Sequence, residues 1–368
     1  MNNWIIVLVL FAFAKASLAQ TNESAVSSSF SIDASYYYGA VLQHNSDISH
    51  LITGHPEGVI LRYNERTYGE KEWQSLYGFP DFGFTFSYQN LKNRSLGEAF
   101  GAYAHYNFYA FHRQLQYSIG TGIAYMTNPY DPVTNFRNVA YGTRFTSATY
   151  LQANYRKESL IGSIGLQTGI TLIHYSNGNI KEPNTSTNSL LFNVGLNWSL
   201  EPENPIYKRW SIEKYKEPIH INAILRYGWN ESNLRGSGQF PFYTFSFYVD
   251  KRLNKKSSIH AGTELMLTDF LKEHRDYQAN SFPNSGITGN ESTARIGLIA
   301  GHELHIGKTS VLTYLGVYMY DEINYGSVIY NRIGLQRSIN NHWLTSLTLK
   351  SHGGASAEAL SIGLGYRL

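Results

Sequence analysis

The sequence contains no cysteine among its 368 residues. Disulfide scaffolds, cysteine-based zinc sites, iron–sulfur clusters and thiol catalysis are therefore excluded. Charged residues are also scarce, at 15%, whereas an ordinary soluble domain contains about 25%. The formal net charge of +3 gives no basis for expecting a nucleic-acid partner.

Long hydrophobic runs are missing as well. The one apolar run of any length, Trp4–Ala14, is too short to cross a bilayer, which needs about 20 residues. Small residues follow it in Ser17-Leu18-Ala19, as at a signal-peptidase cleavage site. We therefore expect residues 1–19 to be a cleaved signal peptide and residues 20–368 to be the mature chain.

Tyrosine, glycine and alternating hydrophobicity are abundant. The chain has 29 Tyr and 32 Gly, and apolar residues recur at every second position, as in strands with two unlike faces. Clear examples are Phe82–Tyr88, Leu190–Leu200, Tyr243–Val249 and Leu360–Leu368. This pattern predicts an all-β protein, an antiparallel transmembrane β-barrel of the bacterial outer membrane. We expect one barrel domain over residues 20–368 with about 14–16 strands, 12 being possible; a soluble β-sandwich would not need so many.

Loop lengths favour the same fold. Outer-membrane barrels have long external loops and short periplasmic turns. If the first strand runs outward, the connections after odd-numbered strands should be long, and they are. These connections are 43–58, 127–141, 177–187, 230–240 and 271–290. Two connections, 69–79 and 201–218, are long where short turns are expected.

Polar residues gather at the outer end of one predicted hairpin. His174 and Ser176 share the parity of the lipid-facing residues before them, and Asn188 shares the parity of Leu190 on the returning strand. A polar group that faces lipid is costly unless it is paired or functional. The three residues therefore predict a site for a membrane substrate, although a wet polar belt at the membrane interface would show the same residues.

These residue types suit ester hydrolysis. Ser176 would be the nucleophile and His174 its general base. Asn188 would orient the imidazole, although a neutral amide stabilises an imidazolium less than a carboxylate does. Asn177 and Gly178 would stabilise the oxyanion. We expect no resident metal, because the His and Asp residues of loop 43–58 are spaced too loosely.

The motif His174-Tyr175-Ser176-Asn177, followed by Lys181, Pro183 and Asn184, resembles the outer-membrane lipid A 3-O-deacylases of the acyloxyacyl-hydrolase type. The resemblance implies that the His and Ser of the motif are base and nucleophile. It also makes Lys181 and Asn184 candidates for substrate binding. In that family a Glu on the next strand completes the triad, whereas this chain has Asn188 at the matching position. The nearest carboxylate, Glu182, lies in the connecting loop.

The same segment also resembles the outer-membrane phospholipase A family, whose triad is Ser-His-Asn within an H-x-S-N-G motif. Asn188 and Gly178 match that pattern, and the resemblance implies a calcium requirement. The close match to either family covers residues 170–198. The stretch Tyr36–Tyr88 is similar to longer envelope proteins known as acyloxyacyl hydrolases.

Three functions therefore stay open. The first is an outer-membrane hydrolase that removes a 3-O-linked acyl chain from lipid A, with no cofactor. The second is a phospholipase A-like enzyme, with calcium as its cofactor. The third is a non-catalytic porin or structural barrel. The expected partner of either enzyme is lipopolysaccharide or phospholipid in the outer leaflet, and the oligomeric state is open.

Overall fold

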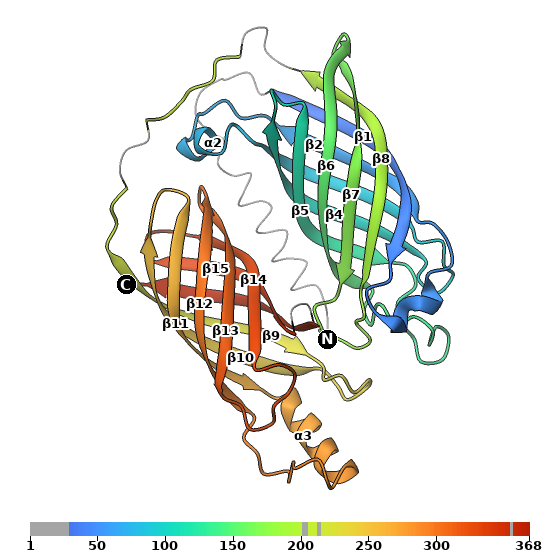
Figure 1. The fold of residues 1–368 in the computed structure, drawn as a ribbon, viewed down its shortest axis with the longest axis vertical. Coiled ribbons are helices and arrows are strands. Elements are labelled where there is room, and N and C mark those ends of the chain that lie inside the picture. Colours follow the sequence, from blue (N-terminus) through green and yellow to red (C-terminus); the bar gives the residue numbers. More distant parts are fainter. Residues whose placement is uncertain (1–28, 201–204, 212–214, 354–355) are drawn as a thin grey trace. The chain divides into compact units, whose positions relative to one another are not determined.

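The computed structural model describes residues 29–200, 205–211, 215–353 and 356–368. Its strands form two closed antiparallel barrels of eight strands each (Figure 1). The expected signal peptide lies outside the described residues. Within the described part of the chain, no helix has the length and hydropathy needed to cross a membrane.

The first barrel contains a 3₁₀ helix and a short α-helix between its strands. In chain order its elements are β1 (Phe30–Leu42), η1 (Ser46–Leu51), β2 (Glu57–Glu65), α2 (Glu72–Leu76), β3 (Asp81–Asn90), β4 (Glu98–Ala110), β5 (Leu115–Met126), β6 (Phe145–Ile161), β7 (Ile164–Ser176) and β8 (Thr187–Leu200).

The second barrel contains one longer helix in an outer loop. In chain order its elements are β9 (Ile219–Asn230), β10 (Phe240–Arg252), β11 (Ser257–Thr268), α3 (Phe270–Ser281), β12 (Ala294–Ile306), β13 (Thr309–Tyr320), β14 (Ile329–Ser338), β15 (Trp343–His352) and β16 (Ser356–Arg367).

The all-β, antiparallel class is confirmed, but the expected single barrel is corrected to two. β8 pairs with β1 along its whole length, from Phe30↔Leu200 to Leu42↔Asn188, and β16 pairs with β9. Alternation along a strand fixes which side chains face inward, but not where the sheet closes. Eight strands leave an interior just wide enough for side chains to fill, and both interiors are filled.

The connections 69–79 and 201–218, which are longer than expected for periplasmic turns, contact one another. The backbone N–H of Lys208 donates to the carbonyl of Tyr68 at 2.8 Å. The indole Nε1–H of Trp210 donates to the carbonyl of Gly69, also at 2.8 Å. We call residues 205–210 the strap. The strap belongs to the connection 201–218, which links the last strand of the first barrel to the first strand of the second. This connection is longer than a periplasmic turn because it joins two barrels and not two neighbouring strands of one barrel.

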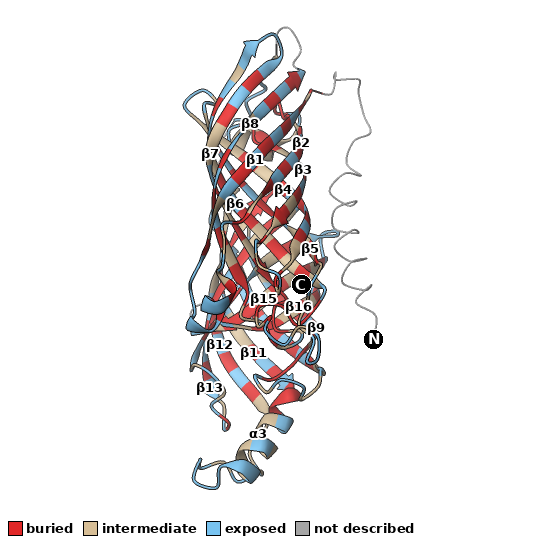
Figure 2. Ribbon diagram, turned by 90° about the vertical axis from the view of Figure 1, so that its right-hand side faces the viewer, coloured by how far each residue is buried: buried red, intermediate tan, exposed pale blue. Residues whose placement is uncertain are grey.

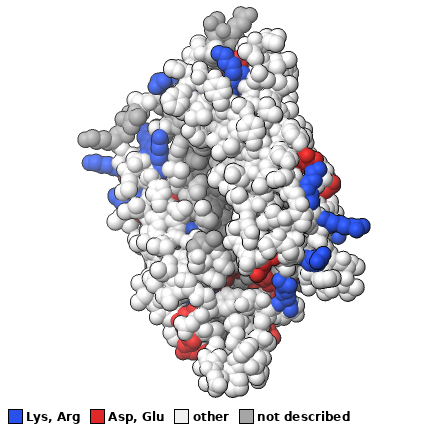
Figure 3. Space-filling model, turned by 45° about the vertical axis from the view of Figure 1, so that its right-hand side comes forward, with Lys and Arg blue, Asp and Glu red and all other residues white. Residues whose placement is uncertain are grey.

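Burial alternates along the strands, with inward residues buried and outward residues exposed (Figure 2). The outward residues are mainly Leu, Ile, Val, Phe and Tyr. On the face drawn in Figure 3, charged side chains are scattered and large areas of surface carry none. Such a surface suits contact with lipid.

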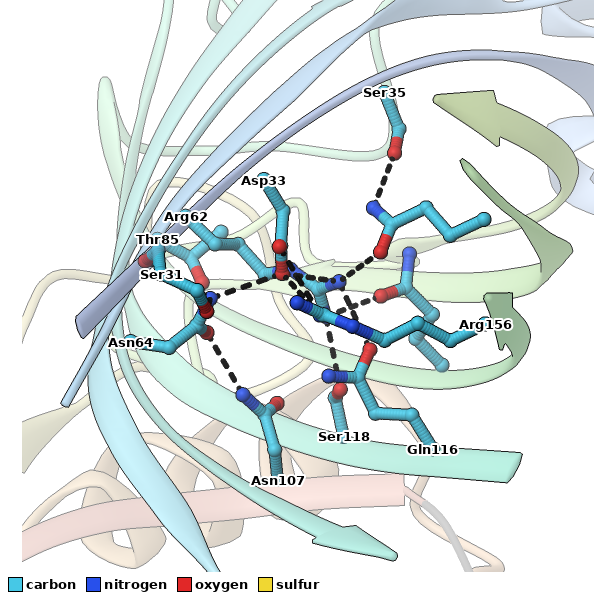
Figure 4. A network of polar contacts seen from close by, with 12 residues as sticks. Ser31, Asp33, Ser35, Arg62, Asn64, Thr85, Asn107, Gln116, Ser118 and Arg156 are labelled. Carbon is cyan, nitrogen blue, oxygen red and sulfur yellow. Dashed lines mark hydrogen bonds and ion pairs between the residues drawn. The ribbon is translucent and has the colours of Figure 1, made fainter. Parts of the chain in front are cut away.

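Polar side chains fill the lumen of the first barrel. Asp33 lies between two guanidinium groups, 3.0 Å from Arg62 and 3.0 Å from Arg156, and all three side chains are buried (Figure 4). Arg62 also donates to Gln116 and Ser118 at 2.9 Å. Towards the outer end, a cluster of buried tyrosines and aliphatic residues closes the interior.

The second barrel is filled in the same way. Glu264 accepts ion pairs from Arg332 at 3.1 Å and from Arg226 at 3.4 Å. Glu358 pairs with Lys350 at 2.8 Å, and Arg295 contacts the same carboxylate. Each lumen is therefore packed with mutually compensating charges, unlike the water-filled channel of a porin.

Candidate active site

The centre of the candidate site is a directly facing pair on β7 and β8. His174 and Asn188 are register partners, and Nδ1 of the imidazole lies 2.7 Å from Oδ1 of the amide. Because an amide oxygen only accepts, the imidazole carries its proton on Nδ1, and Nε2 is left as the basic nitrogen. Both residues have outward parity and are half-buried, as the alternation predicts.

Ser176 has the parity of His174 but is buried, with 3% of its surface exposed. This differs from the lipid-facing exposure expected from parity. The reason is the loop after β7, which places Asn184 against the strand end. The Ser176 hydroxyl donates to Asn184 Oδ1 at 3.2 Å. The nucleophile candidate therefore lies beneath a loop residue, close to the wall but not open to lipid.

The same amide oxygen of Asn184 also accepts the backbone N–H of Asn177, at 2.9 Å. One oxygen thus receives both the Ser176 hydroxyl and an N–H from the adjacent residue. A substrate carbonyl attacked by Ser176 would need its oxygen near that N–H. Gly178 has a φ of +65°, a left-handed conformation that glycine adopts without cost, so the backbone turns here. Lys181 lies further along this loop and is exposed.

Two residues on β6 belong to the same surface and were missed from the sequence. Thr149 is the register partner of His174 on its other side, and Ser147 is the partner of Ser176. Ser147 Oγ donates to the backbone carbonyl of Ser176 at 2.8 Å. The alternation of residues 145–155 carried the signal, since it gives Ser147 and Thr149 outward parity at the outer end of their strand.

The external histidines hold loops together. His44 contacts the carbonyl of Thr185 at 2.9 Å, His50 that of Arg137 at 2.8 Å, and His55 that of Gly39 at 3.0 Å. Among the residues that the structure describes, no group of three or more His, Asp or Glu side chains could hold a metal ion.

A buried tyrosine anchors the loop beside the site. Tyr141 is fully buried and its hydroxyl hydrogen-bonds to that of Thr187, the residue before Asn188. Burial raises the pKa of Tyr141 above its ordinary value, so the phenol stays neutral at any pH relevant to the site. The contact ties loop 127–144 to the start of β8.

The corresponding hairpin of the second barrel, β15 and β16, lacks the paired histidine and asparagine. Its outward register pairs towards the outer end are Leu347↔Ile362 and Leu349↔Leu360, followed at the strand ends by His352↔Ser356. His352 is therefore the register partner of a serine, and the residue two positions after it is Gly354. Among the described β7–β8 and β15–β16 hairpins, an imidazole paired with an asparagine and followed two residues later by a serine occurs in the first barrel alone.

Two family models match the chain, one for each barrel. Residues 57–197 match the model described as lipid A 3-O-deacylase, and residues 219–368 match the model described as the C-terminal domain of acyloxyacyl hydrolase. The first match contains the candidate site. No curated protein matches the sequence significantly.

Solved structures give only distant likenesses. A double mutant of the porin of Rhodopseudomonas blastica is 11% identical, with a TM-score of 0.20 over 92% of this chain and 99% of the porin. CdiB from Acinetobacter baumannii is 8% identical, with a TM-score of 0.20 over 94% of this chain and 60% of CdiB. At these TM-scores neither likeness carries an argument about this chain.

Proposed function

Because the chain belongs to the family of lipid A 3-O-deacylases and acyloxyacyl hydrolases, we propose that it is an outer-membrane hydrolase that removes a 3-O-linked acyl chain from lipid A. The observation that carries the proposal is the 2.7 Å contact between Nδ1 of His174 and Oδ1 of Asn188. His174 lies two residues before Ser176 on the same strand. A base oriented by an acceptor and followed by a hydroxyl is the arrangement that nucleophilic ester hydrolysis needs.

The reaction would proceed by acyl transfer. The hydroxyl of Ser176 turns from Asn184 towards His174, gives its proton to Nε2, and attacks the ester carbonyl. The backbone N–H of Asn177 donates to the oxygen that becomes negative. His174 then protonates the leaving sugar oxygen, and the acyl group stays on Ser176. Water, deprotonated by His174, releases the fatty acid and restores the serine.

Phospholipid is the second candidate substrate. The amide of Asn188 in the third position matches the Ser-His-Asn pattern of the outer-membrane phospholipase A family better than the Glu of the deacylases. The chemistry at Ser176 would be the same, and the leaving group would be a glycerol oxygen. The resemblance implies calcium as the cofactor of this variant, and among the described residues no group of three or more His, Asp or Glu side chains could hold it.

A porin function has less support. The interior of the first barrel is crossed by the buried Asp33–Arg62–Arg156 ion pairs, and a channel needs open space there. Polar groups on the outer wall, in contrast, have no role in conduction. The arrangement favours a site that takes its substrate from the membrane.

The test compares Ser176→Ala with a matched control, Ser351→Ala. Both serines are buried at the end of the seventh strand of a barrel, and each donates to the Oδ1 of an asparagine, at 3.2 Å and 3.1 Å. Lipid A and phospholipids of cells expressing each protein would be analysed by mass spectrometry. We expect the wild type and Ser351→Ala to remove one acyl chain from lipid A, and Ser176→Ala to remove none.

Lysophospholipid in place of deacylated lipid A would assign the second substrate. Unchanged lipids in every strain, with all proteins inserted, would refute a hydrolase. Equal activity of Ser176→Ala and wild type would remove Ser176 from the mechanism.

A further inference from the structure

The inner end of the second barrel has a polar pocket of about 280 Å³. It lies where β9 begins, where β16 ends and where the short turn 339–342 leads into β15, and these three strands are neighbours in the sheet (Figure 1). Short turns mark the periplasmic end of a membrane barrel. The polar side chains that line the pocket include Glu217, His220, Asn341, His342 and Arg367. We call this cavity the rim pocket.

Arg367 supplies the positive charge of the rim pocket. Its Nη2 lies 3.2 Å from the carboxylate of Asp250, and its Nε donates to Oδ1 of Asn222, also at 3.2 Å. Both partners are buried, so they hold the guanidinium in one orientation at the pocket. These contacts use two of its three nitrogens. A guanidinium fixed in this way presents its remaining N–H groups in the planar geometry that suits a phosphate.

Glu217 supplies the negative charge. The ammonium of Lys251 donates to its backbone carbonyl at 2.6 Å and so ties the residue to the end of β10. The Tyr215 hydroxyl interacts with the Glu217 carboxylate. The second carboxylate oxygen, Oε2, is buried, yet it accepts no hydrogen bond from the residues that the structure describes. A buried acceptor without a donor is costly, so this oxygen is matched to a donor that comes from a ligand.

The two opposite charges line one pocket without pairing with each other. In the described part of the second barrel, no ion pair joins Glu217 to Arg367. Opposite charges held apart in one cavity are complementary to a ligand that carries both charges. The ammonium group of such a ligand meets Glu217, and its anionic group meets Arg367. The side-chain amide of Asn341 adds N–H donors for the anionic group.

Trp343 shows where such a ligand comes from. It lines the rim pocket, but its parity on β15 is outward and 43% of its surface is exposed. Its ring packs edge to face against that of Tyr366, with centroids 5.2 Å apart. Outward aromatic residues at strand ends lie at the level of the lipid headgroups. The rim pocket therefore reaches the part of the barrel wall that meets phospholipid headgroups.

We propose that the rim pocket binds the phosphoethanolamine headgroup of a phospholipid, with the ammonium at Glu217 and the phosphate at Arg367. The acyl chains of this lipid extend past Trp343 into the leaflet that faces the periplasm. The lipid is bound and not cleaved, and it anchors the inner rim of the second barrel at the membrane surface. This inference goes beyond the proposed hydrolase and does not depend on Ser176.

The test measures lipid binding to the full-length protein by native mass spectrometry in detergent micelles. The probes are dihexadecyl phosphatidylethanolamine and dihexadecyl phosphatidylglycerol, both ether-linked, so that a hydrolase has no ester to cleave. We expect the wild type to bind the ethanolamine lipid about tenfold more tightly, because only this lipid offers a charged donor to Glu217. Glu217→Gln keeps the size of the side chain but removes its charge. It should bind both lipids equally, with the affinity that the wild type has for the glycerol lipid.

Glu65→Gln is the matched control. Glu65 is also half-buried and lies at the inner end of its strand, β2 of the first barrel, outside the rim pocket. This variant should keep the tenfold preference. Arg367→Lys keeps the charge but loses the planar fork, so it should weaken both lipids by a similar factor, since both carry a phosphate.

Binding of the glycerol lipid reports on folding in each variant. Equal binding of the two lipids by the wild type, or a full preference retained in Glu217→Gln, would overturn the proposal. Glycerophosphoethanolamine, which has the headgroup without the chains, distinguishes a lipid from a free solute. If it binds as tightly as the lipid, the pocket serves a solute of the periplasm and the lipid is refuted. Because the ether lipids cannot be hydrolysed, none of these results changes the standing of the proposed hydrolase.

Discussion

His174 and Asn188 face each other across β7 and β8, with imidazole Nδ1 2.7 Å from amide Oδ1. The amide fixes the ring orientation and the tautomer as a carboxylate would. It brings no negative charge to stabilise the imidazolium that would form if His174 deprotonates Ser176 as proposed. In the proposed mechanism the amide therefore orients the imidazole but stabilises its charged form less than a carboxylate would.

Substitutions at Asn188 separate these two contributions. Asn188→Ala should lower kcat by about 10²-fold, because the imidazole loses the contact that positions it. Asn188→Glu should raise kcat about tenfold or more, because a carboxylate stabilises the imidazolium. Both would be measured with p-nitrophenyl hexanoate in micelles. Val194→Ala, a lipid-facing change on the same strand, is the control and should leave kcat unchanged. An unchanged kcat in Asn188→Ala would show that the amide has no part in catalysis.

The sequence predicted the strands and their faces, because period-two alternation is a local property. It could not predict two barrels, since the register partners on β1 and β8 lie 146 to 170 residues apart in the sequence and the alternation is the same for either closure. The clue lay in two exceptions. The connections 69–79 and 201–218 were long where inner turns should be short, and the structure joins them through Lys208 and Trp210.

The candidate site was likewise predictable only where it lies in regular strands, and not where it depends on a loop. Parity along two strands was enough to bring His174 opposite Asn188, since both lie in regular sheet. It failed for the environment of Ser176, which depends on how loop 177–186 folds and where Asn184 lies. Loop conformation is set by particular hydrogen bonds and not by a repeating pattern.

The lumen of the first barrel provides a stability prediction. Asp33 is buried between Arg62 and Arg156 at 3.0 Å from each. Asp33→Asn keeps the size of the side chain but leaves two buried guanidinium groups without their common anion. Removing one partner of a buried ion pair costs about 3–5 kcal/mol. We expect the free energy of unfolding, measured by urea titration in detergent micelles, to fall by about that amount.

An exposed ion pair supplies the control for that measurement. Glu57 and Lys92 are 2.5 Å apart, with about a third of each side chain exposed. Exposed ion pairs contribute little, since water screens both charges. Glu57→Gln should therefore leave the free energy of unfolding nearly unchanged. A similar loss in Asp33→Asn and Glu57→Gln would contradict the view that burial gives the Asp33 pairs their importance.

The strap, residues 205–210, depends on one glycine. Gly69 has a φ of +97°, and a Cβ there would collide with the carbonyl oxygen of Lys208. Its own carbonyl accepts the indole N–H of Trp210 at 2.8 Å. Packing of Tyr207 against Phe79, with ring centroids 4.8 Å apart, completes the contact.

Gly69→Ala should therefore detach the strap, and Gly78→Ala should not. Gly78 has a similar φ of +72° but nothing within 4 Å of the position of a Cβ, so it shares the backbone strain without the collision. Lys208 and Arg209 are exposed in the attached strap, but the backbone hydrogen bond from Lys208 to Tyr68 holds their segment in place. Detachment frees this backbone to enter the active site of trypsin, and proteolysis follows the population of the opened segment. We expect brief trypsin treatment in detergent micelles to cut Gly69→Ala after these residues several times faster than wild type or Gly78→Ala. Equal cleavage of the two variants would mean that backbone strain, and not the contact with Lys208, governs how the linker is held.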